Sequence, residues 1–146
     1  MGEAAPERNA SVVHASCVAW GARAVLIRGA AGRGKSGLAL RLMALGAGLV
    51  ADDRTRLWRE GARLMADAPA TIRGRIEARG AGILTVPAVG PVPLVLVVDL
   101  DAEAESRLPP LKQTEVEGIR LPLLENAPYK HFTATILLYL KGASLT

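Results

Sequence analysis

Short apolar runs separated by glycine-containing turns make up the first third of the chain. Residues 11–19 and 23–27 are β-favouring runs joined by a glycine turn, so we expect them to form a hairpin. Leucines then recur at helical spacing over 38–45, and Gly46 is placed to end that helix in a left-handed conformation. A second short apolar strand is expected at 48–51. The pattern predicts two strands, a helix and a further strand.

The middle of the chain predicts further strands and no membrane segment. Residues 54–58 and 62–67 flank a Glu-Gly turn and are typical of a hairpin. The uncharged run 80–98 approaches the length of a bilayer span, but three prolines and several glycines interrupt it. We therefore expect two buried strands there, at 83–86 and 94–100, joined by a turn.

The end of the chain predicts a short edge segment at 121–124 and a closing helix. Asn126 is placed to cap that helix, and its apolar stripe consists of Tyr129, Phe132, Ile136 and Leu140. The whole pattern favours an α/β fold: a mixed β-sheet with hairpins and a C-terminal helix packed on it.

Length and composition narrow the class of protein. The 146 residues suit one domain, which we expect over 11–146 after a disordered tail at 1–10. A net charge of +4, with only two Trp, two Tyr and one Phe, argues against nucleic-acid binding. The single cysteine, Cys17, excludes an internal disulfide, suits the reducing cytoplasm and is interpreted as a small buried residue.

The most specific motif lies between the strand at 23–27 and the helix at 38–45. It satisfies G-x-x-x-x-G-K-[ST], in which glycines let successive backbone N–H groups turn toward phosphate. Lys35 would reach the β- and γ-phosphates, and the Ser36 hydroxyl would supply an oxygen for Mg²⁺. The predicted nucleotide-binding residues are Gly29, Ala30, Ala31, Gly32, Arg33, Gly34, Lys35 and Ser36.

Carboxylates follow two of the predicted strands. Asp52 and Asp53 end the strand at 48–51, so they should face the same crevice as the phosphate loop. Of the two, one is suited to Mg²⁺ and the other to accepting a proton from an attacking hydroxyl. Asp99, with Asp101, competes for these roles at the end of a later apolar strand. Glu77 is open to two interpretations, a surface ion pair or a metal ligand.

Four segments together resemble the catalytic domain of HPr kinase/phosphorylase. They are His14, the loop 29–36, the V-A-D-D sequence ending at Asp53, and the E-x-R-G-x-G-I sequence that starts at Glu77. The resemblance implies a P-loop kinase core like that of phosphoenolpyruvate carboxykinase. It also implies ATP and Mg²⁺ as cofactors and phosphorylation of a serine of the phosphocarrier protein HPr. Removal of that phosphate by phosphorolysis with inorganic phosphate, and assembly as a homo-oligomer, a hexamer, are implied as well.

The resemblance also assigns roles to residues. It implies that His14, Lys35 and Asp52 are catalytic, with Asp52 as the acid–base group, and that Ser36, Asp53 and Glu77 hold the metal. Gly37 departs from the family pattern, in which many members have glutamate after the loop serine, and Ala81 replaces a usual leucine. We therefore expect an HPr-type serine kinase, and the alternative is a nucleotide-binding regulatory module without transfer activity.

Overall fold

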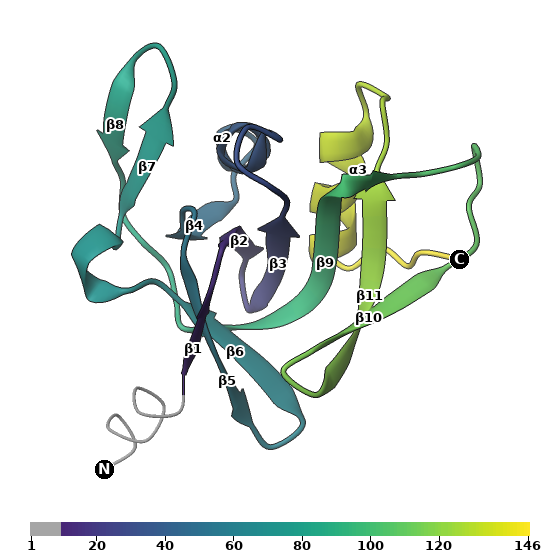
Figure 1. Cartoon of the computed structure of the whole chain (residues 1–146), viewed down its shortest axis with the longest axis horizontal. Helices are drawn as coiled ribbons and strands as arrows, with labels where there is room; N and C mark the ends of the chain where they lie inside the picture. Colours follow the sequence, from purple (N-terminus) through teal and green to yellow (C-terminus); the bar gives the residue numbers. More distant parts are fainter. Residues whose placement is uncertain (1–9) are drawn as a thin grey trace.

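The computed structural model describes residues 10–146 and consists of mixed β-sheet with two α-helices (Figure 1). The predicted tail at 1–10 lies almost wholly outside the described residues. The strands are β1 (Ser11–Val13), β2 (Ala15–Trp20), β3 (Arg23–Arg28), β4 (Gly48–Ala51), β5 (Thr55–Glu60), β6 (Arg63–Asp67), β7 (Arg75–Ala78), β8 (Gly82–Thr85), β9 (Val92–Glu103), β10 (Lys112–Val116) and β11 (Ile119–Asn126). The helices are α2 (Lys35–Ala44), α3 (Phe132–Leu140) and a 3₁₀ turn, η1 (Ala70–Ile72).

The long strand β9 joins two parts of the sheet. The strand order is β1-β5-β6-β9-β3-β2-β4, and β9 also pairs with β11, which pairs with β10. Strands β3, β9 and β11 are mutually parallel, while β2 runs antiparallel to both β3 and β4. The carboxyl ends of β3, β4, β9 and β11 therefore meet along one side of the sheet, which we call the carboxyl edge.

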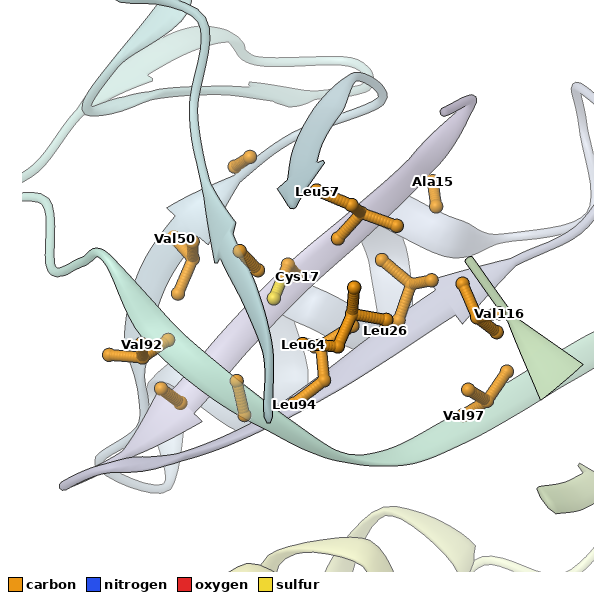
Figure 2. Packing of buried hydrophobic residues seen from close by; sticks show 14 of the residues in the cluster. Ala15, Cys17, Leu26, Val50, Leu57, Leu64, Val92, Leu94, Val97 and Val116 are labelled. Atoms are coloured by element: carbon orange, nitrogen blue, oxygen red, sulfur yellow. The ribbon is translucent and has the colours of Figure 1, made fainter. Parts of the chain in front are cut away.

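Two hydrophobic layers cover the two faces of the sheet. In β3 the side chains alternate: Val25 and Ile27 pack toward α2 and α3, while Leu26 packs toward β5 and β6. Figure 2 shows the second layer, where Leu57 and Leu64 lie with Leu26. Cys17 is fully buried in the same layer, as the sequence suggested, and burial beside Asp67 raises the pKa of its thiol far above the usual range.

Several predicted elements are confirmed. The β2–β3 hairpin runs from Ala15 opposite Arg28 to Trp20 opposite Arg23, and β5 pairs with β6 as expected. Helix α2 ends at Ala44, and Gly46 has the expected positive φ, 113°. No helix within residues 10–146 is long and apolar enough to cross a membrane.

Other predicted bounds of strands and helices were wrong. In each case pairing between strands distant in the sequence decided where the element begins and ends. The run 11–19 is divided by a bend at His14, since β1 pairs with β5 and β2 with β3. The segment 121–124 is not an edge but part of β11, between β9 and β10. Asn126 ends β11 and caps no helix, because α3 starts at Phe132.

The predicted buried strand at 83–86 was also wrong. Strand β8 is exposed along its length and pairs only with β7, in a hairpin separate from the main sheet. Figure 1 shows this hairpin projecting at the upper left, beyond β4 and the start of α2. The apolar residues of β8 therefore belong to a protruding hairpin and not to the hydrophobic core.

Candidate active site

The loop at 29–34 connects β3 to the first turn of α2 at the carboxyl edge. Gly32 and Gly34 have φ values of 85° and 98°, a left-handed region that side chains rarely adopt. Gly34 is the N-cap of α2, and its carbonyl accepts from the Leu38 N–H over 3.0 Å. The helix N-terminus, with its free N–H groups, therefore opens onto the loop, an arrangement suited to binding an anion.

Lys35 is held inside this loop. Its side chain is 5% exposed, and Nζ donates to the carbonyl oxygen of Gly29 over 2.8 Å. The same ammonium group lies 4.0 Å from Oδ1 of Asp53. Lys35 therefore connects the loop to the acids that follow β4.

Asp52 is buried, and hydrogen-bond donors surround its carboxylate. Ser36 Oγ donates to Oδ1 over 2.6 Å, and Ser16 Oγ donates to the same oxygen over 3.0 Å. The backbone N–H of Glu77 donates to Oδ2 over 3.1 Å. Asp52 is therefore tied to the loop serine, to β2 and to β7 at once.

Asp53 lies in different surroundings although it is the next residue. Its φ is 68°, and its side chain is 55% exposed. Oδ1 lies 2.7 Å from Nε2 of His14, and the Asp53 N–H donates to Ser16 Oγ over 3.0 Å. The left-handed backbone at Asp53 thus turns its carboxylate toward His14 and Lys35, while Asp52 faces Ser36.

Ser16 connects the two acids, and sequence reasoning missed it. The side chain is fully buried in β2, where its hydroxyl donates to Asp52 and accepts from the Asp53 backbone. A serine within an apolar strand gave no separate motif. The only signal was a polar residue at a buried strand position, which must have hydrogen-bond partners.

A cavity of about 380 Å³ opens beside the two acids. Its lining is Asp52, Asp53, Arg54, Ile72, Arg75, Ile76, Glu77 and Ile83. Glu77 contacts Asp52 through its backbone N–H. Within residues 10–146 no three or more His, Cys, Asp or Glu side chains are arranged to hold a metal ion.

The acids at the end of β9 lie on the other side of the loop. Asp99 Oδ2 is 3.5 Å from Nε of Arg28, and Asp101 accepts from the Ala30 N–H over 3.0 Å and from Nε of Arg33 over 3.0 Å. The Ala30 N–H and then the Arg33 guanidinium hold the pKa of Asp101 below its usual range. Asp101 therefore holds the loop in place, and neither acid is hydrogen-bonded to Ser36.

The structure thus brings together most of the residues that the sequence singled out. His14, Lys35, Ser36, Asp52 and Asp53 form one connected group, and Glu77 borders it. Asp99 and Asp101 are separate from that group. The arrangement combines an anion-binding loop, a buried cation, a hydroxyl–carboxylate pair and an exposed carboxylate next to a histidine.

Comparison with known proteins identifies the family. The family model for the HPr serine kinase C-terminal domain matches residues 7–91, and the chain belongs to this family. The solved structure of the Hpr(Ser) kinase/phosphatase from Coxiella burnetii is similar, with a TM-score of 0.76 and 26% identity, over 90% of this chain and 88% of that one.

Curated relatives match over a shorter stretch. HPr kinase/phosphorylase from Lactococcus lactis subsp. lactis is 48% identical over 63 residues, and that from Chromobacterium violaceum is 46% identical over 63 residues. Each match covers 42% of this chain and 20% of the relative. The matched part is therefore about a fifth of the length of these relatives.

Proposed function

We propose that this chain is an ATP- and Mg²⁺-dependent kinase that phosphorylates a serine of an HPr-type phosphocarrier protein. The observation that carries the proposal is the pairing of His14 with Asp53 next to Lys35, beside the hydrogen bond between Ser36 and Asp52. Phosphoryl transfer needs a cation beside the phosphates and a group that accepts a proton. Lys35 is suited to the first role and a carboxylate beside it to the second.

The phosphates of ATP would lie on the loop 29–36. Its glycines and the start of α2 direct backbone N–H groups toward an anion. Lys35 would exchange its bond to the Gly29 carbonyl for bonds to phosphate oxygens. In this buried position a fixed positive charge stabilises the charge that develops on the transferred group.

The donors near Ser36 fit Mg²⁺. The Ser36 hydroxyl lies 2.6 Å from an oxygen of Asp52, and hard oxygen groups of this kind suit a small cation that retains most of its water. Ser36 would be a direct ligand, and Asp52 would hold it in place and bind the metal or its water. When bound, the ion neutralises charge on the β- and γ-phosphates.

The proton acceptor that the geometry favours is Asp53, and not Asp52 as the resemblance implied. Asp52 is buried and already accepts from two serine hydroxyls and a backbone N–H, so an acceptor protein would reach it poorly. Asp53 is 55% exposed and borders the cavity beside β7. We therefore propose exchanged roles, with Asp53 as the base, His14 as its positioning partner, and Asp52 on the metal side.

The acceptor serine would enter through this cavity. Its hydroxyl would give its proton to Asp53 as its oxygen attacks the γ-phosphorus. The bond between that phosphorus and the bridging oxygen of the β-phosphate would break, and ADP would remain on the loop until it dissociates. In phosphorolysis inorganic phosphate would attack the phosphorus of phosphoserine. The bond from that phosphorus to the serine oxygen would break, protonated Asp53 would give its proton to this oxygen, and the products would be serine and pyrophosphate. Glu77 borders the cavity, where its carboxylate could complete the metal site.

Incubation with γ-labelled ATP, Mg²⁺ and HPr tests this function. We expect label on wild-type HPr and none on an HPr variant whose reactive serine is replaced by alanine. Mass spectrometry of the product should find phosphoserine. ATP binding with no label on HPr would contradict the kinase and support a regulatory module, the reading that Gly37 favours.

We also propose a homo-oligomer, a hexamer, because of family membership. Exposed apolar side chains give physical support, among them Val12 at 58% and Leu138 at 56% exposure. Sedimentation of the protein at tens of micromolar, a concentration at which micromolar associations are populated, should give a single species of six chains. A monomer under those conditions would contradict this assembly.

A further inference from the structure

Two arginines line the cavity of about 380 Å³ beside Asp53, and the transfer chemistry proposed above uses neither of them. Arg54 directly follows Asp53 in the chain, and Arg75 belongs to the β7–β8 hairpin. Both residues are exposed. The charged groups that share the lining are the carboxylates of Asp52, Asp53 and Glu77. The cavity therefore contains two cations in addition to the acids already discussed.

These two arginines have no charged partner. Arg73, two residues before Arg75, forms an ion pair with the buried carboxylate of Asp67. Neither Arg54 nor Arg75 forms an ion pair with any side chain of residues 10–146. A guanidinium group presents its N–H donors in a planar fork that matches the oxygens of a phosphate or carboxylate. Two such forks are therefore available to an anion that enters the cavity.

The backbone that carries Arg54 is held on both sides. The Arg54 N–H donates to the carbonyl oxygen of Asp52 over 2.7 Å, and Oγ1 of the buried Thr55 donates to the carbonyl oxygen of Ala15 over 2.8 Å. Binding costs less when the binding group is already fixed in position. Only the side chain of Arg54 would have to be ordered by a ligand next to Asp53.

Arg75 is held beside the same acids by its strand. The Glu77 N–H donates to Oδ2 of Asp52 over 3.1 Å, and Ile76 is buried in the hydrophobic layer that contains α2. Residues two apart on a strand leave the same face and are separated by about 6.7 Å. Arg75 and Glu77 therefore both face the cavity, with Arg75 about one side-chain length from the Asp52 contact.

The charges in the cavity suit a phosphomonoester better than a hydroxyl. Asp53 and Glu77 would repel an anion, and the guanidinium groups of Arg54 and Arg75 would offset that repulsion. Phosphoserine has a charge of about −1.5 to −2 at pH 7 and three acceptor oxygens, and arginine binds such groups through paired hydrogen bonds. An uncharged serine needs no such cations. The two arginines therefore fit the acceptor after it has received the phosphoryl group.

We propose that Arg54 and Arg75 bind the phosphoryl group of phosphoserine on the acceptor protein and distinguish the phosphorylated acceptor from the unphosphorylated one. This assignment rests on the proposed kinase function and adds recognition of its product to it. Bound in this way, phosphoserine would lie next to Asp53, as phosphorolysis requires. Free inorganic phosphate has the same chemistry, so the test must separate the two sources of phosphate.

Calorimetry with three ligands makes this separation. HPr, HPr phosphorylated on its reactive serine, and inorganic phosphate are titrated into wild type and Arg75→Gln without nucleotide. We expect phosphorylated HPr to bind wild type more tightly than HPr does. Arg75→Gln should weaken the binding of phosphorylated HPr by roughly 10- to 150-fold, as expected when hydrogen bonds between charged groups are lost. The affinities for HPr and for inorganic phosphate should remain within a few-fold.

Three further variants serve as controls. Arg54→Gln should reproduce the selective loss. Arg75→Lys keeps the charge without the planar fork, so it should recover only part of the affinity for phosphorylated HPr. Arg63→Gln changes an exposed arginine that contacts Met65 outside the cavity and should alter no affinity.

The outcomes distinguish this site from the kinase activity. Equal binding of HPr and phosphorylated HPr by wild type would overturn the phosphoserine site and leave the kinase proposal intact. A loss in Arg75→Gln that is confined to inorganic phosphate, or that is equal for HPr and phosphorylated HPr, would also overturn it. Selective binding of phosphorylated HPr by a wild type that transfers no label from ATP would overturn the kinase and keep the site.

Discussion

The two sides of the phosphate loop differ in chemistry although both lie at the same edge of one sheet. Toward β4, Asp52 and Asp53 are connected to Ser36, Ser16, His14 and Lys35 by short polar contacts. Toward β11, the surface is an apolar cavity with a stacked Tyr129–His131 pair. The polar side therefore has the groups that the proposed proton transfer and metal binding need, and the largely apolar side does not.

The largest effect should come from the side toward β4. Asp53→Asn keeps the shape and removes the base, so we expect transfer to HPr to fall by roughly 10²- to 10⁴-fold, the usual worth of a general base. Affinity for ATP should remain within a few-fold, because Asp53 is not needed to hold the phosphates. Single-turnover transfer measures the first quantity and calorimetry the second. Glu115→Gln on β10 is the control, and transfer at the wild-type rate by Asp53→Asn would refute the assignment.

In the proposed site every phosphate contact depends on the loop 29–36, so a substitution of Lys35 should affect ATP binding directly. Lys35→Ala should weaken ATP binding by roughly 10- to 150-fold, as expected when a hydrogen bond between charged groups is lost. Tripolyphosphate should lose a similar factor, because the proposed contacts of Lys35 are to the phosphates. Lys141→Ala, a change next to Trp20, provides a matched control. Unchanged calorimetric affinity in Lys35→Ala would remove the phosphate site from the loop 29–36.

Ser16 tests whether the side toward β4 is one connected unit. Ser16→Ala removes the acceptor of the Asp53 N–H and one donor to Asp52. We expect unfolding by urea to show a loss of about 1–3 kcal/mol, the cost of leaving a buried polar group without its partner. Ser11→Ala, at an exposed serine bonded to Glu117, should cost far less. Equal stability of the two variants would mean that water replaces the Ser16 hydroxyl.

Asp101 holds the loop between the two sides, and we expect its substitution to have the smallest effect on the protein. The depressed pKa means that folding favours the charged form. The stabilisation is therefore present above the ordinary value of 3.8 and is lost as the pH falls through the lowered pKa. The melting temperature of wild type should exceed that of Asp101→Asn at pH 7, and the difference should disappear on acidification below pH 3.8. A difference that persists in acid would mean that charge is not its cause.

Local pattern was enough to predict the β2–β3 hairpin, α2 and the position of Asp52 and Asp53 next to the loop. A glycine-rich motif between a strand and a helix constrains its neighbours strongly. The pattern failed where pairing between distant segments decides the structure: β11 lies between β9 and β10, and β8 protrudes although its sequence is apolar. Ser16 and the cavity near Tyr129 were missed for the same reason, because each depends on segments far apart in the chain.

The sequence predicted that Asp52 and Asp53 differ in role, but the surroundings of each carboxylate could not be predicted, for a more local cause. Alternation along an extended strand predicts that adjacent side chains point to opposite faces. The positive φ of Asp53 instead turns its carboxylate toward His14 at the same edge as Asp52. No motif indicates that conformation at an aspartate, so the direction of the Asp53 carboxylate could not be predicted from the sequence.

A Mg²⁺ titration of single-turnover transfer in Asp52→Asn and Asp53→Asn tests whether these neighbouring acids have different roles. We predict that Asp52→Asn needs roughly 10- to 100-fold more Mg²⁺, the usual cost of losing a group that supports a metal site, and recovers much of its rate at saturation. Asp53→Asn should stay slow at every Mg²⁺ concentration. Recovery of Asp53→Asn by Mg²⁺, with Asp52→Asn inactive throughout, would contradict the account and return the role of base to Asp52.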